Sequence, residues 1–416
     1  MDFLVTGGRV VTPTGVIDPG VVGISGGRVV SVGAAADTED ALAQTSRSLR
    51  APAGRTPERL DVHGATVYPG FIDLHIHGSG GGDAVSGSAE SLRRMAAFLA
   101  TGGTTAFLGT TMTAPRAMLD AALRTMAEFQ VARGSSPEAP SPLNPLGARL
   151  IGAHLEGPFI NPARKGAQPA EFARRPSVEE AAELIDAHPG LVRQMTLAPE
   201  LPGGLELVRY LRSRGVVASI GHSDATYEQA KEAFRAGVTH SSHTYSAMRG
   251  LHHREPGTVG AVLLTPSVTA EVIADGVHAH PAAVELLVRV KGPEGVALVT
   301  DAIPFAGLPE GCYDAMDTPV MVQRGAAYLQ DGQTLAGSTL TMAVAVSNIM
   351  SFTGLDEVAA AQMAALTPAR VLGMDHDYGS IEPGKVADLT ILGTDGRPAV
   401  TVVGGRVVWR RREGKG

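Results

Sequence analysis

The chain has 416 residues, of which 44% are hydrophobic and 19% are charged, so it holds enough apolar material for a large folded core. Its formal net charge of −7 excludes the basic surface that binding to nucleic acid or to an anionic membrane requires. The single cysteine, Cys312, excludes an intrachain disulfide and favours a reducing, cytoplasmic location. No apolar run reaches the roughly 18 residues that a membrane span needs. Because 13 histidines stand in the chain beside only 5 lysines, histidine is the residue type to follow.

Both ends of the chain predict short β-strands joined by tight turns. The pentapeptide Gly-Gly-Arg-Val-Val recurs within β-branched runs bounded by Gly, Pro and Asp, at residues 7–11, 26–30 and 404–408. We therefore expect residues 1–65 and 376–416 to form one small split β-domain, a β-sandwich built from both chain termini. Residues 34–60 show no apolar periodicity and residues 132–147 are rich in proline, so both segments are predicted to be exposed loops.

Residues 66–375 follow another rhythm, in which apolar β-branched runs alternate with helix-like segments. The predicted strands are 70–77, 104–110, 149–155, 194–198, 216–221, 238–242, 268–274 and 296–300. The predicted helices include 89–101, 116–133, 177–187, 204–214, 226–236 and 281–290. This alternation indicates a parallel sheet covered by helices, and eight units predict a (β/α)₈ TIM-like barrel. No Gly-x-Gly-x-x-Gly follows the first strand, which argues against a dinucleotide-binding fold.

Ionisable side chains stand at the ends of five predicted strands. They are His75, His77, Glu156, His222, His243 and Asp301. Because the carboxyl ends of barrel strands meet at one rim, where active sites lie, we expect these six side chains to converge. Strand alternation places His75 and His77 on the same face, and imidazole with carboxylate ligands suits zinc or another first-row divalent ion. The run Thr-His-Ser-Ser-His leaves His240 open as an alternative to His243.

Several motifs carry a resemblance to a known family. The segment PGFIDLHIHG at 69–78 is similar to the first-strand signature of the amidohydrolase superfamily. Seven further motifs resemble, in the same order, those of the N-acetylglucosamine-6-phosphate deacetylase family: HLEGPF at 154–159, GHSDA at 221–225, HTYSAM at 243–248, REPG at 254–257, DGVH at 275–278, VTDA at 299–302 and GSTL at 337–340. The resemblance extends from about residue 2 to about residue 408 and implies the same barrel with a small split β-domain.

This resemblance implies a metal centre and a reaction. It makes Glu156, His222 and His243 metal ligands, selecting His243 over His240, and lets His75 and His77 hold a second ion. We therefore expect one or two divalent ions per chain, with zinc preferred and iron or another first-row metal as alternatives. The implied reaction removes the N-acetyl group of N-acetylglucosamine 6-phosphate by attack of a metal-bound hydroxide. Asp301 is then the general base and acid, and His278 stabilises the carbonyl oxygen.

The resemblance also implies a homodimer and a set of substrate contacts. Arg254 is expected to reach the phosphate from the neighbouring subunit, and the other contacts are Ser246, Ala247, His278 and Gln168. His253 is added as a phosphate contact because it stands beside Arg254 in the most cationic cluster of the barrel loops. Two of these depart from the family, which usually has Asn in place of Ser246 and His in place of Gln168. The substrate could therefore be another N-acetyl amino sugar.

Two further alternatives are an N-acyl-D-amino acid deacylase and a non-catalytic barrel scaffold. The fourth predicted strand ends at Ala198 without a lysine, which argues against a centre bridged by a carboxylated lysine. The intact set of histidines and carboxylates at the strand ends argues against the scaffold.

Overall fold

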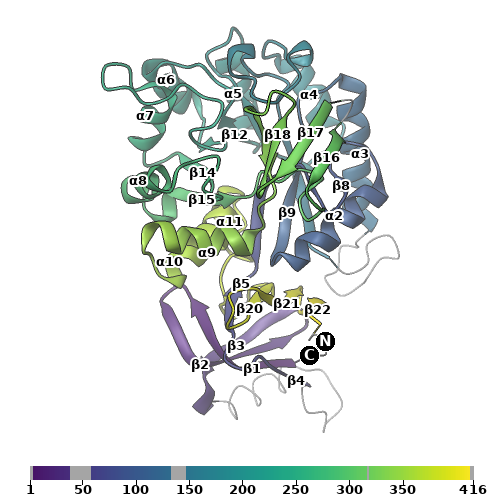
Figure 1. Cartoon of the computed structure of the whole chain (residues 1–416), viewed down its shortest axis with the longest axis vertical. Helices are drawn as coiled ribbons and strands as arrows, with labels where there is room; N and C mark the ends of the chain where they lie inside the picture. The colour runs from purple at the N-terminus through teal and green to yellow at the C-terminus, as the bar shows by residue number, and fades with distance from the viewer. Residues whose placement is uncertain (1–2, 38–57, 133–146, 316–317, 413–416) are drawn as a thin grey trace.

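The computed structural model describes residues 3–37, 58–132, 147–315 and 318–412. The loops predicted at 34–60 and 132–147 lie largely outside these ranges. Figure 1 shows a barrel with a β-sheet below it that contains strands from both ends of the chain.

The barrel is an eight-stranded parallel sheet in which each strand neighbours the next one along the chain. Its strands are β6 (Phe71–Ile76), β9 (Thr104–Thr110), β10 (Arg149–Glu156), β11 (Val192–Leu197), β12 (Val217–Ile220), β13 (His240–Ser241), β14 (Thr269–Ile273) and β15 (Val296–Val299). At the carboxyl ends of the edge strands β6 and β15, Asp301 N donates to His75 O (2.8 Å) and His77 N donates to Ala302 O (2.9 Å). These bonds nearly close the sheet, and the predicted TIM-like barrel is confirmed.

Helices cover the outside of the sheet (Figure 1). They are α2 (Ala89–Thr101), α3 (Arg116–Ala132), α4 (Val178–Asp186), α5 (Gly204–Ser213), α6 (Tyr227–Ala236), α7 (Gly257–Leu263), α8 (Pro281–Lys291), α9 (Met342–Thr353), α10 (Glu357–Ala361) and α11 (Thr367–Val371), with a π-helical turn η5 (Gln362–Leu366). Short 3₁₀ turns are η2 (Pro162–Arg164), η3 (Ala170–Phe172) and η4 (Pro293–Gly295) in the barrel domain and η1 (Ala35–Asp37) after β3 in the terminal sheet. All six predicted helices are present.

Local sequence explains where these helices begin and which face they bury. Ser88 caps α2 by accepting from Ser91 N, and Thr226 begins α6 in a capping box with Gln229. The buried face of α2 includes Leu92 and Leu99, which join the core that the barrel strands share. Among the described residues, no helix combines the length and the apolar character needed to cross a membrane.

The terminal sheet joins the two ends of the chain. Its strands are β1 (Phe3–Thr12), β2 (Gly15–Ser25), β3 (Arg28–Ala34), β4 (Glu58–Asp61), β5 (Thr66–Pro69), β20 (Leu389–Leu392), β21 (Pro398–Val403) and β22 (Arg406–Arg410). Strand β5 pairs with β1 on one side and with β20 on the other, so it connects the N-terminal and C-terminal strands. The strands bury a separate apolar cluster that includes Val22, Val67 and Ile391.

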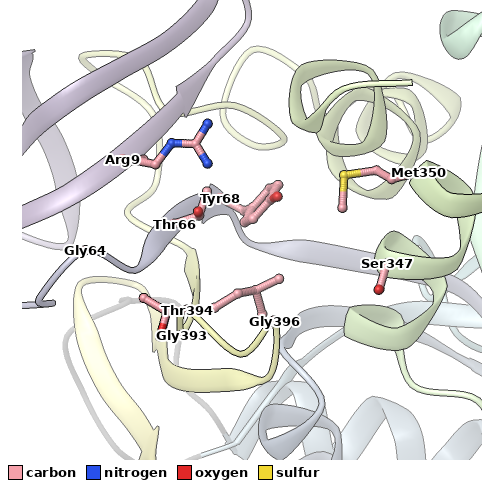
Figure 2. Close-up of a pocket in the computed structure, with 10 residues that line it drawn as sticks. Arg9, Gly64, Thr66, Tyr68, Ser347, Met350, Gly393, Thr394 and Gly396 are labelled. Carbon is pink, nitrogen blue, oxygen red and sulfur yellow. The ribbon is translucent and has the colours of Figure 1, made fainter. Parts of the chain in front are cut away.

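A surface pocket of about 340 Å³ lies between this sheet and the barrel. Figure 2 shows Arg9, Tyr68 and Met350 among the residues around it. The Arg9 guanidinium is already bound to Glu357 Oε1 at 2.7 Å, which ties β1 to α10. The pocket contains none of the predicted site residues.

A four-stranded antiparallel sheet after β15 was not predicted. Its strands are β16 (Gly311–Ala315), β17 (Thr318–Gln323), β18 (Ala326–Leu329) and β19 (Leu335–Ser338), and a two-stranded ribbon, β7 (Gly78–Ser79) with β8 (Gly82–Asp83), follows the first barrel strand. The sheet packs Val320 and Val322 against Ile303 and Phe305. Its last strand also holds the turn that follows β15, because Ser338 N donates to Asp301 O at 2.8 Å.

Candidate active site and metal centre

Glu156, the last residue of β10, lies where four predicted histidines meet. Its Oε1 lies 2.9 Å from His243 Nε2, 3.1 Å from His222 Nε2 and 3.2 Å from His75 Nε2. Its Oε2 lies 3.3 Å from His77 Nε2. The carboxylate is only 2% exposed. Imidazole nitrogens from the end of β6 and from the segments after β12 and β13 therefore surround one buried carboxylate at the end of β10.

Asp301 completes this cluster from the segment after β15. Its Oδ1 lies 3.2 Å from His77 Nε2 and 3.6 Å from His75 Nε2. Asp301, His222 and His243 all have positive φ angles, of 48°, 48° and 30°. Such a conformation costs a non-glycine residue about 1–3 kcal/mol and is concentrated at functional sites. The structure thus brings together all six side chains predicted at the strand ends.

The cluster fits a divalent metal ion. His75 Nε2 is buried and faces two carboxylate oxygens, yet it makes no hydrogen bond with any of the described residues. Two sets of three residues place their ligand atoms within 4.8 Å of one another: His75, Glu156 and His243, and His75, His77 and Asp301. Imidazole and carboxylate donors without sulfur suit first-row divalent ions. This donor chemistry is that of a metal-binding site.

The surrounding imidazoles keep the carboxylates ionised. Burial opposes ionisation, but His75 and His222 outweigh it and hold the pKa of Glu156 well below its usual range. In the same way, burial of Asp301 is outweighed by His75 and His77, which lower the pKa of that carboxyl. Ionised oxygens can coordinate a metal ion or accept a proton, which are the two tasks that hydrolysis at such a site needs.

Gln168 contacts this cluster, and His278 is close enough to Asp301 to interact with it electrostatically. The Gln168 side-chain amide donates to Glu156 Oε2, and its oxygen accepts from Thr113 N at 2.7 Å. His278 Nδ1 lies 2.6 Å from Asp275 Oδ2. Burial would lower the pKa of His278, but the hydrogen bond to Asp275 outweighs it and raises that pKa. His278 is therefore held in one orientation with a bias toward its protonated, hydrogen-bond-donating form.

The remaining predicted substrate residues divide into two places. Ser246 N donates to His243 O at 2.9 Å, and Ala247 O accepts from Ser223 N at 3.2 Å, so both lie in the loop that follows His243. His253 and Arg254 are exposed and contact each other at 2.9 Å. Within the described part of the chain, no hydrogen bond or ion pair joins either of them to the histidine cluster.

The sequence interpretation missed one central residue, Glu271. It is fully buried in β14, and its oxygens contact His75, His240, His243 and Gln194. The alternative ligand His240 therefore binds Glu271 and does not reach Glu156 by any contact among the described residues. The available signal was the single carboxylate in the predicted strand 268–274, whose other residues are Val, Thr, Ala and Ile.

Known proteins resemble this chain over most of its length. The model of the amidohydrolase family matches residues 66–408. The N-acetylglucosamine-6-phosphate deacetylase of Vibrio furnissii is 41% identical over 355 residues, which cover 85% of this chain and 86% of that protein. The N-acetylgalactosamine-6-phosphate deacetylase of Escherichia coli O157:H7 is 40% identical over 326 residues, covering 78% of this chain and 83% of that protein.

A solved structure is similar over nearly the whole chain. It is a mutant N-acetyl-D-glucosamine-6-phosphate deacetylase from Mycobacterium smegmatis in complex with N-acetyl-D-glucosamine-6-phosphate. Its TM-score is 0.85 at 33% identity, with 98% of this chain and 99% of that chain covered. Since the family model and these relatives match most of its length, the chain belongs to the amidohydrolase family of metal-dependent hydrolases.

Proposed function

We propose that this protein hydrolyses the acetamide of N-acetylglucosamine 6-phosphate to glucosamine 6-phosphate and acetate. The observation that carries the proposal is the convergence of four imidazoles on Glu156, with Asp301 beside them. Relatives that share 33–41% of its sequence are deacetylases of this phosphorylated sugar by name. The same site chemistry suits amide hydrolysis, because it combines metal-type ligands with an ionised carboxylate.

The metal part of the proposal assigns ligands by residue. Glu156, His222 and His243 would hold one ion, and His75 with His77 would hold a second that shares Glu156. Zinc is the expected metal, with iron or another first-row ion as the alternative. We expect one or two ions per chain. A bound divalent ion lowers the pKa of a water ligand toward ~7 and polarises a carbonyl oxygen.

Asp301 moves the proton in this scheme. Its carboxylate accepts a proton from the attacking water as the new C–O bond forms at the acetamide carbonyl. It returns that proton to the nitrogen as the C–N bond breaks, so the product leaves as a neutral amine. His278, oriented through its Nδ1 by Asp275, donates from its other ring nitrogen to the carbonyl oxygen as negative charge develops there.

The sugar and phosphate are assigned to the loops around this centre. Ser246 and Ala247, in the loop after His243, contact the substrate together with Gln168, whose side-chain amide donates to Glu156 Oε2. Arg254 and His253 bind the phosphate. Because both are exposed on a single chain, we propose a homodimer in which Arg254 of the partner subunit completes the site. The sugar phosphate substrate and the single thiol also fit a cytoplasmic location.

A second substrate, N-acetylgalactosamine 6-phosphate, is favoured by the 40% identical relative that is named for it. The deciding experiment measures acetate release by the zinc-loaded protein from both phosphorylated sugars and from unphosphorylated N-acetylglucosamine. We expect the highest kcat/KM with N-acetylglucosamine 6-phosphate. A higher value with the galactose isomer would reassign the substrate, and equal rates with and without phosphate would refute the phosphate requirement. A metal-loaded protein that releases no acetate would refute the deacetylase proposal.

A further inference from the structure

We propose that Glu271 is a positioning residue that sets both metal positions at once, by orienting the ring of His75 and the backbone of His243. The inference rests on the metal centre of the proposed function. It concerns a residue of β14 that stands behind the ligands and touches no predicted substrate contact among the described residues.

The Glu271 carboxylate is saturated by donors. Its Oε2 lies 2.9 Å from His75 Nδ1 and accepts from His243 N at 3.1 Å. Its Oε1 lies 2.9 Å from His240 Nε2 and accepts from the Gln194 side-chain amide at 2.8 Å. A carboxylate offers about four lone-pair positions, and all of them are used here. Because the group is fully buried, these four contacts fix its position.

The contact with His75 determines which of its ring nitrogens can bind a metal ion. A carboxylate accepts hydrogen bonds, so the proton of the neutral ring lies on Nδ1 and the lone pair on Nε2. That Nε2 faces Glu156 Oε1 at 3.2 Å and Asp301 Oδ1 at 3.6 Å. A carboxylate behind a ligating histidine is a general means of fixing the ring and of strengthening it as a ligand. Without Glu271, the ring could turn or carry its proton on Nε2.

The contact with His243 acts on the second metal position through the backbone. His243 has a φ of 30°, a conformation that a residue with a side chain rarely adopts. Two hydrogen bonds to Glu271 hold this turn: the one from His243 N to the side chain, and one from Thr244 N to Glu271 O at 2.9 Å. Glu271 thus ties the ligand on β6 to the ligand that follows β13.

Three variants separate this role from a general effect on folding. Glu271→Met keeps the size but removes every acceptor, whereas Glu271→Gln keeps one oxygen for His75 and His243. Gln194→Met is the matched control, because it removes one donor from the same carboxylate and touches no ligand. The measurements are zinc stoichiometry after dialysis, zinc affinity by chelator competition, and the visible spectrum of the cobalt-substituted protein.

Loss of a group behind a ligand typically weakens metal binding by about 10–100-fold. We expect Glu271→Met to bind zinc about 100-fold more weakly than wild type at both metal positions, with an altered cobalt spectrum. We expect a loss of about 10-fold for Glu271→Gln, and wild-type binding for Gln194→Met. If Glu271→Met does not fold, Glu271→Gln decides the question. Zinc affinity of that variant equal to wild type would overturn the inference.

The outcomes also separate this inference from the proposed function. A wild-type protein that binds no zinc or other divalent ion would refute the metal centre itself. A wild type that binds zinc alongside Glu271 variants that bind it equally well would refute only the role of Glu271. Equal losses in Gln194→Met and Glu271→Met would also refute it, because the effect would then belong to the buried polar layer as a whole.

Discussion

Replacing Asp301 with asparagine tests the proton-transfer role in the proposed reaction. The change keeps the size of the side chain and one oxygen, but an amide cannot accept the proton of the attacking water. Because Oδ1 lies 3.2 Å from His77 and 3.6 Å from His75, the substitution perturbs contacts on that side of the cluster only. Glu156, with its shorter contacts to His222 and His243, is left in place.

The expected loss follows from the number of steps that Asp301 serves. A positioned general acid or base contributes about 10²–10⁴-fold to the rate of a reaction. Asp301 accepts a proton in one step and returns it in the next, so the loss should lie in the upper part of that range. We expect kcat to fall by about 10³-fold or more, equivalent to about 4 kcal/mol of transition-state stabilisation, while the zinc content stays that of wild type.

The assay combines acetate release with metal analysis of the same samples. The matched control is Asp395→Asn, the same chemical change in an exposed carboxylate of the turn between β20 and β21, where it pairs with Arg411 at 2.8 Å. This control should keep wild-type activity. Activity of Asp301→Asn above about a tenth of wild type at full zinc content would refute the proton-transfer role, which should account for about 10²-fold or more. Loss of zinc together with activity would make Asp301 a ligand instead.

Three further predictions concern the metal, the pH dependence of stability and the core. His222→Ala should lose the ion held with Glu156, whereas His75→Ala should keep it, as metal analysis would show; complete loss of metal in both variants would contradict two separate positions. Burial lowers the pKa of Lys291 to about 8, so between pH 8 and 10 the unfolded chain holds a proton that the folded chain has lost, and this residue's contribution to stability rises with pH. Urea unfolding should show wild type gaining stability relative to Lys291→Met over that range, and a constant difference would refute it. Phe107→Ala, at a fully buried position of β9, should lower the free energy of unfolding by about 3–5 kcal/mol in the same assay, and a loss below about 1 kcal/mol would contradict its place in the core.

The barrel and the clustering of the six strand-end side chains could be predicted from sequence because each depends on a local pattern. An apolar run marks a buried strand, and the first ionisable residue after it lies at the rim, as with Glu156 and Asp301. The choice between His240 and His243 could not be made in this way. Strand β13 contains only His240 and Ser241, and the chain turns at once into the left-handed conformation of His243. Three residues of sequence therefore separate a buried strand position from a rim position.

The features that the sequence did not predict are set by contacts between distant parts of the chain. In the sequence, Glu271 is only one polar residue within a predicted strand. Its place in the site comes from its hydrogen-bond partners on β6, β11 and β13. The sheet β16–β19 was not predicted because much of it is only partly buried, so the apolar pattern of its sequence is weak. Arg254 is exposed on a single chain, and its assignment to phosphate rests on the family resemblance.

The three carboxylates of the site have different surroundings, and these surroundings suit different tasks. Glu271 is fully buried with every lone pair used, so it can orient other groups but cannot take up a proton without losing a bond. Glu156 is 2% exposed and shared among four imidazoles, which suits a ligand common to two ions. Asp301 is the most exposed at 9%, and its Oδ2 accepts no hydrogen bond from the described residues. A proton carrier needs an open oxygen beside the reacting groups, and of the three only Asp301 has one.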